Sequence, residues 1–172
     1  MSDDTIVQRV SMPAVARVLA FCAIAGGLLR IADSFAANYL PADTLPALYL
    51  ATDIFLLSGM AGCWWRRRRM LGIAGTAGLA IFVAGILMIR ASAFGVVGYQ
   101  LGATVALLGF ASYSIETLIR RSAAPWAPLL WLLSLALGIA GVAGIAPQSM
   151  ILAAGMVFGA GFVAAGVEIL SA

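Results

Sequence analysis

Four charged residues lie inside stretches that are otherwise apolar, namely Arg30, Asp33, Asp53 and Arg90. A charge at bilayer depth costs about 2.5–3.5 kcal/mol on insertion scales unless it finds a partner or water. Arg30 and Asp33 are three positions apart, which places them on one face of a helix. Carboxylates beside guanidinium groups can bind a polar or anionic ligand, act as general acid and base, or pair with each other across helices.

Polar residues near the same ends of the apolar stretches extend this group. Tyr49 lies one helical turn before Asp53, and Tyr99 and Gln100 open a later apolar stretch from the same side. We therefore predict an outward-facing polar cavity whose ligand-binding residues are Arg30, Asp33, Tyr49, Asp53, Arg90, Tyr99 and Gln100.

The composition places this chain in a membrane. Of its 172 residues, 63% are hydrophobic and 10% are charged, which lies outside the range of soluble domains. All ten basic residues are arginine. Histidine is absent from the chain, so zinc and haem sites lack their usual ligand. We predict no metal and no cofactor, and we expect Cys22 and Cys63 to be free buried thiols.

Six apolar segments of about 20 residues predict an all-α integral membrane protein, since about 20 residues cross a bilayer. The fold expected is a compact bundle of six transmembrane helices with short loops. Residues 1–12 form a short polar cytoplasmic segment, and residues 13–172 form a single domain. The predicted spans are about 14–34, 45–65, 70–90, 94–118, 126–146 and 149–170.

The arginines predict the orientation of the bundle. All except Arg30 and Arg90 fall on one side of an alternating path, which the positive-inside rule assigns to the cytoplasm, together with both termini. Residues 1–36 also fit a cleaved signal peptide, as an alternative. Four consecutive arginines in a short turn supply no extended basic face, so we exclude a nucleic-acid partner. The predicted topology anchors are Trp64, Trp65, Arg66, Arg67, Arg68, Arg69, Arg120 and Arg121.

Two acidic residues fall near the inner ends of their spans. Glu116 precedes Arg120 by four residues, which predicts a helical salt bridge, and Glu168 is expected to meet the arginine turn. Glycines at sevens in the fourth span predict close helix packing. These faces serve either packing within the bundle or a partner, which would be a second copy of the chain or another membrane subunit.

Three functions remain open from the sequence. The first is a carrier or ligand-binding protein using the outward polar cavity. The second is an intramembrane enzyme acting on a lipophilic molecule by epoxide opening, cyclisation or isomerisation, with Asp33, Asp53, Arg30 and Tyr49 as catalytic residues. The third is a non-catalytic assembly subunit. The lipid bilayer is the expected partner. Arginine without lysine, together with abundant alanine and glycine, fits a GC-rich bacterial genome, so we expect a multi-pass protein of a bacterial inner membrane.

Overall fold

A computed structural model describes residues 13–36, 38–92, 95, 98–121 and 124–171 of the chain. The predicted N-terminal segment 1–12 lies outside these residues. Every regular element within the described ranges is an α-helix. The helices are α1 (Ala14–Ala36), α2 (Leu45–Arg67), α3 (Ile73–Ser92), α4 (Tyr99–Ile119), α5 (Trp126–Val142) and α6 (Pro147–Leu170).

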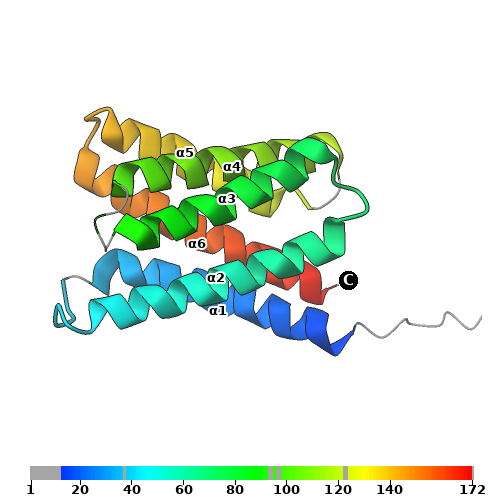
Figure 1. Cartoon of the computed structure of the whole chain (residues 1–172), viewed down its shortest axis with the longest axis horizontal. Helices are drawn as coiled ribbons and strands as arrows, with labels where there is room; N and C mark the ends of the chain where they lie inside the picture. The colour runs from blue at the N-terminus through cyan, green and yellow to red at the C-terminus, as the bar shows by residue number, and fades with distance from the viewer. Residues whose placement is uncertain (1–12, 37, 93–94, 96–97, 122–123, 172) are drawn as a thin grey trace, which may run out of the picture.

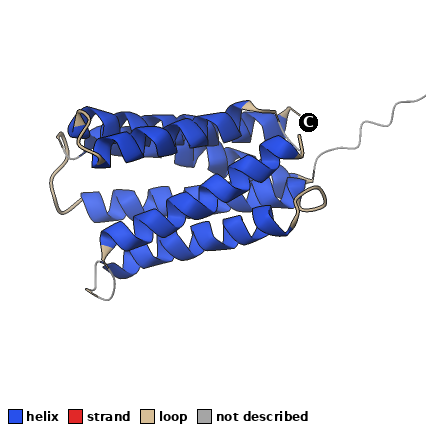
Figure 2. Cartoon of the chain, turned by 90° about the horizontal axis from the view of Figure 1, so that it is seen from above, coloured by secondary structure: helices blue, strands red, loops and turns tan. Residues whose placement is uncertain are grey.

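Helix α6 lies in the middle of the bundle, with α1 and α2 on one side and α3, α4 and α5 on the other (Figure 1). It packs along α1 and α5, while α1 also packs along α2. Helices α3 and α4 form a separate closely packed pair that meets α5 through α4. Figure 1 shows the chain reversing its direction after each helix, and Figure 2 shows the same helical bundle from above. As a result, α1 begins and α6 ends at the end of the bundle that holds the α2–α3 and α4–α5 connections, here called the arginine-rich end.

Five of the six helices are long and apolar enough to cross a membrane, judged by length and composition. Large apolar side chains are exposed on every helix, as at Val18, Ile54, Leu87, Leu108 and Leu133 among others. Contiguous apolar surface of this kind is unfavourable in water and suits contact with lipid chains. The length and composition of the helices therefore support the prediction of a multi-pass helical membrane protein.

Helix α5 is shorter than the span predicted at 126–146, because it ends at Val142. Gly144 has φ of 88° and Ala146 has φ of 43°, so the backbone leaves the right-handed helical region there. The next helix then begins at Pro147, whose fixed φ and missing N–H suit a first helical position. Helix α4 begins at Tyr99, after Gly98 in an extended conformation; residues 94, 96 and 97 of the predicted span lie outside the described residues. Helix α3 begins at Ile73 rather than at 70, because the turn after α2 extends to Met70.

Glycines allow two helix pairs to touch backbone to backbone. A Cβ atom added at Gly159 of α6 would lie 2.5 Å from the carbonyl oxygen of Gly27 of α1. A Cβ atom at Gly109 of α4 would lie 2.5 Å from the carbonyl oxygen of Gly78 of α3. Small residues of this kind drive helix association where lipid removes the hydrophobic advantage. The glycine-rich faces of α3, α4 and α6 are thus used for packing within the bundle at these positions.

An aromatic cluster joins α3, α4 and α5 to the central helix α6. Phe110 of α4 lies 4.5 Å from Phe82 of α3 and 4.6 Å from Trp131 of α5, measured between ring centroids. Phe162 of α6 stacks on Phe110 at 5.7 Å. These separations are the usual range for attractive aromatic pairs. The cluster is the apolar connection between the α3–α4 pair and α6.

We expect Gly159→Ala to lower the free energy of unfolding by about 1–3 kcal/mol, because backbone atoms of α1 cannot yield to the added methyl group. Gly138→Ala is the matched control, since nothing lies within 4 Å of its Cβ position. The control should be neutral or stabilised by up to about 1 kcal/mol through helix propensity. Unfolding of both variants in detergent micelles measures the difference. Equal stability of the two variants would contradict the close α1–α6 approach.

Candidate functional site

One interhelical ion pair lies at the end of the bundle opposite the arginine-rich end. Arg90 of α3 donates through Nε to Asp53 of α2, and a second guanidinium nitrogen of Arg90 also approaches that carboxylate. Arg90 Nη2 donates to the main-chain carbonyl of Tyr49, at 2.7 Å. Both charged groups are therefore engaged by α2 and α3. Pairing across helices was one of the arrangements open from the sequence, and the structure has it.

Asp33 of α1 lies one helix away from this pair and is only 6% exposed. Its Oδ1 atom is buried and has no hydrogen-bond partner among the described residues. Thr52 of α2 lies at the same carboxylate, but its hydroxyl donates to the carbonyl of Leu48 at 3.0 Å. A buried acceptor of this kind without a donor costs about 1–3 kcal/mol or more. Asp33 is thus the acidic group of this end that is left incompletely satisfied.

Arg30 lies one turn before Asp33 on α1 and is half-buried against α6. Its Nη2 atom would lie 3.2 Å from a Cβ atom at Gly155, so the missing side chain of Gly155 makes the room that the guanidinium occupies. Within the described part of the chain, Arg30 has no carboxylate within ion-pair distance. Five guanidinium N–H donors are therefore present with no anionic partner assigned to them.

The four charges form one electrostatic group. Arg30 and Arg90 both lie close enough to attract the negative charge of Asp33. The charge of Asp53 is attracted by Arg30 and repelled by Asp33. Asp53 and Arg90 bind each other, whereas Arg30 and Asp33 each have polar atoms without a hydrogen-bond partner among the described residues. This arrangement can accept a ligand that offers an anionic group to Arg30 and a donor to Asp33.

The remaining predicted ligand-binding residues are Tyr49, Tyr99 and Gln100. Tyr49 contributes its carbonyl oxygen to Arg90, and its side chain is half-buried. Tyr99 and Gln100 form the first turn of α4, and their side chains lie outside the described part of the structure. The described residues contain no group of three or more His, Cys, Asp or Glu that could hold a metal ion, and Cys22 and Cys63 are free thiols.

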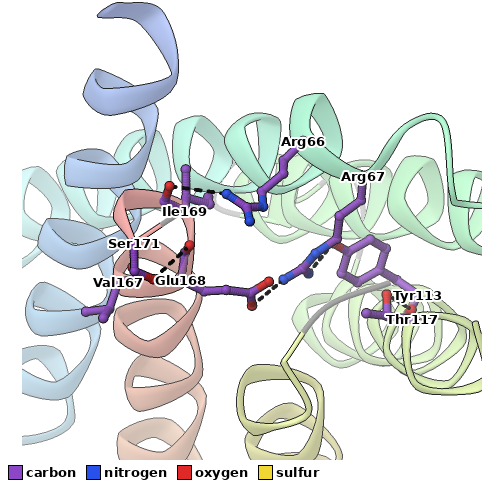
Figure 3. A network of polar contacts seen from close by, with 8 residues as sticks. All are labelled: Arg66, Arg67, Tyr113, Thr117, Val167, Glu168, Ile169 and Ser171. Atoms are coloured by element: carbon purple, nitrogen blue, oxygen red, sulfur yellow. Dashed lines mark hydrogen bonds and ion pairs between the residues drawn. The ribbon is translucent and has the colours of Figure 1, made fainter. Parts of the chain in front are cut away.

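A second polar network, which the sequence indicated only in part, lies at the arginine-rich end (Figure 3). Arg67 is fully buried and donates to Glu168 of α6 at 2.7 Å and to the hydroxyl of Tyr113 of α4 at 2.9 Å. Arg66 donates to the carbonyl of Ile169 at 3.3 Å. The expectation that Glu168 meets the arginine turn is confirmed. The burial of Arg67 differs from the exposed turn expected, because α2 continues to Arg67 and carries this side chain on its inward face.

At the same end of the bundle, a carboxylate of α4 caps the N-terminus of α3. Glu116 of α4 accepts hydrogen bonds from the backbone N–H of Gly72 at 2.6 Å and from that of Gly75. Those N–H groups have no partner within their own helix, and a negative charge there also complements the helix dipole. Glu116 further accepts from Arg120 Nε at 2.6 Å, which confirms the predicted salt bridge.

The other predicted topology anchors lie at the surface of this end. Arg68 stacks on Trp65, with the guanidinium carbon 4.2 Å from the ring centroid, and lies 5.8 Å from that of Trp64. Arg69, Arg120 and Arg121 are exposed. A stacked arginine–tryptophan pair suits the interface between headgroups and hydrocarbon.

We expect Glu168→Gln to destabilise the protein by about 3–5 kcal/mol, because the Arg67 charge would stay buried without its carboxylate. The double variant Arg67→Met with Glu168→Gln should be less destabilised than Glu168→Gln alone, since it removes the orphaned charge. Arg68→Gln is the control at an exposed position. Equilibrium unfolding in micelles measures these variants together with Arg67→Met alone, and a double variant as unstable as the sum of the two single variants would contradict the coupling.

Comparison with models of known families, with curated proteins and with solved structures finds no match for this chain. Its function has therefore to be argued from the charged groups themselves.

Proposed function

We propose that this chain is a small multi-pass membrane protein that binds a polar ligand at the Arg30–Asp33 site and serves as a carrier or ligand-binding protein. The observation that carries the proposal is the buried Asp33 carboxylate oxygen, which has no hydrogen-bond partner among the described residues, beside Arg30. A ligand that supplies the missing donor would convert an unfavourable buried group into a satisfied one.

The chemistry of the two residues defines the ligand class. Arg30 presents a planar fork of donors that matches a carboxylate or phosphate. Asp33 presents a carboxylate oxygen that matches an ammonium or hydroxyl donor. A small molecule with an anionic group and a nearby amine or hydroxyl satisfies both, and it leaves the local net charge unchanged when it is zwitterionic. Two arginines and two aspartates already balance in this group, so a zwitterion suits the site better than a simple anion.

The enzyme hypothesis has less support from the site. It requires two carboxylates and a tyrosine hydroxyl converging on one substrate. Asp53 is occupied by Arg90, and Tyr49 meets that pair through its carbonyl oxygen. Asp33 and Asp53 were both predicted to bind ligand, and because Asp53 is engaged by Arg90, this proposal keeps the ligand contact at Asp33 only.

Six membrane crossings with both termini in the cytoplasm of a bacterial cell form the second part of the proposal. The support is that Arg66–Arg69, Arg120 and Arg121 lie at the end of the bundle where α1 begins and α6 ends. Helix α5 has 17 residues, or about 25 Å, and lies alongside α6. A helix of that length crosses a bilayer with slight local thinning.

Ligand binding is tested by the thermal stability of the purified protein with glycine or taurine, against acetate and ethylamine as single-charge probes. We expect a zwitterion to stabilise the protein most, by about 2.7 kcal/mol at a hundredfold excess over the dissociation constant. Asp33→Asn and Arg30→Gln should abolish the difference between zwitterion and single-charge probe. Asp43→Asn, an exposed aspartate in the α1–α2 connection, should keep it. A ligand effect that survives in Asp33→Asn, or no effect with any probe, contradicts the proposal and favours an assembly subunit.

Topology is tested with single cysteines in a Cys22→Ala, Cys63→Ala background. Asp43→Cys should react with a membrane-impermeant maleimide in intact cells, because its connection faces outward in the proposal. Arg69→Cys should react only after permeabilisation. The reverse pattern would place both termini outside the cell.

A further inference from the structure

A surface groove runs along α4 where it packs against α3, on the side remote from the Arg30–Asp33 site. Its volume is about 780 Å³, and its walls include Leu108, Ala111, Ile115 and Ile119 of α4 with Ala74 of α3. Leu108 and Ile119 are 62% and 75% exposed, so this wall faces outward from the bundle. No residue of the predicted ligand site lines the groove.

The groove has the length of one bilayer leaflet. Leu108 and Arg120 are twelve positions apart on α4, which corresponds to about 18 Å along the helix. Half of a hydrocarbon core of about 30 Å is about 15 Å. A groove that starts at the helix end and stops near Leu108 therefore spans from the headgroup region to the middle of the membrane.

Charge is confined to one end of the groove, where Glu116 and Arg120 lie. Both Glu116 oxygens are occupied, by Arg120 and by the N–H groups that begin α3. Arg120 is half exposed and uses only Nε in its contact with Glu116. Its two terminal nitrogens hydrogen-bond no other described residue, and the exposed Arg121 follows it in the chain. The polar end of the groove thus offers cationic donors.

We propose that this groove is a binding site for an anionic phospholipid, with one acyl chain along Leu108, Ala111 and Ile115 and the phosphate against Arg120. The hydroxyl of Ser112, which also lines the groove, donates to the Ala74 carbonyl at 3.1 Å, so the charged donors lie at the interfacial end. A largely apolar wall of leaflet length with charge at one end matches an amphiphile that has a single charged end. A transmembrane partner helix would have to continue past Leu108 to the far leaflet. Inorganic phosphate alone would make no contact with the apolar wall of the groove. The proposal is independent of the ligand at Arg30 and Asp33.

The probe is the full chain in a mild detergent, mixed with phosphatidylglycerol or phosphatidylcholine of identical acyl chains, with bound lipid counted by native mass spectrometry. We expect about a fivefold preference for phosphatidylglycerol, the factor that corresponds to one basic contact at the membrane surface. Arg120→Gln should remove this preference and Arg120→Lys should retain it. Ala111→Trp should lower the binding of both lipids, because its ring would fill the groove.

Arg69→Gln is the matched control, since Arg69 is an exposed arginine at the same end of the bundle but outside the groove. It should keep the full preference. The proposal is overturned if Arg69→Gln and Arg120→Gln reduce the preference equally, which would indicate diffuse attraction of anionic lipid. It is also overturned if Ala111→Trp binds as much lipid as the parent. Ile115→Trp tests the same wall if Ala111→Trp does not fold, and each comparison of lipids is made within one variant.

Discussion

Several charges carried by the apolar helices are met by a polar group of another helix, because a charge at bilayer depth is unfavourable without a partner, and these contacts determine much of the bundle. Arg67 of α2 meets α4 and α6, Asp53 of α2 meets α3, and Glu116 of α4 meets the start of α3. Each contact specifies both the neighbour and its rotation, because the partner side chains have to face each other. Glycines then set how closely the helices approach, and the aromatic cluster fills the space between the two polar ends.

The helices themselves could be predicted from the sequence, because about 20 apolar residues between short polar turns have few other uses. The end of α2 could not be placed from hydropathy, since arginines are the residues that a hydropathy profile treats as outside. The inward spacing of Leu56, Met60, Cys63 and Arg67 is the signal that was available, because these positions share one helix face. The early end of α5 is marked by Gly144, whose left-handed backbone follows the last helical turn, but this glycine is one of 19 and could not be told from the packing glycines by sequence.

The members of the candidate site could be predicted from the sequence, but their pairing could not. The four charged residues were identifiable because charges are rare in this chain. Which aspartate pairs with which arginine depends on how the helices are rotated, and the sequence could not decide it. The room for Arg30 comes from Gly155, which is 125 positions away and is one glycine among 19. Likewise, nothing in the sequence singles out Thr52, whose hydroxyl lies beside Asp33 while it donates to the carbonyl of Leu48.

The burial of Arg67 also affects how the chain is synthesised. Its carboxylate partner, Glu168, follows 101 residues later. At about 5–20 residues per second, the ribosome needs about 5–20 s to deliver α6 after α2. During that interval the guanidinium has no counter-charge from Glu168. The ion pair that buries Arg67 can therefore form only after a helix made much later has joined the bundle, so α2 does not reach its final contacts while it is being made.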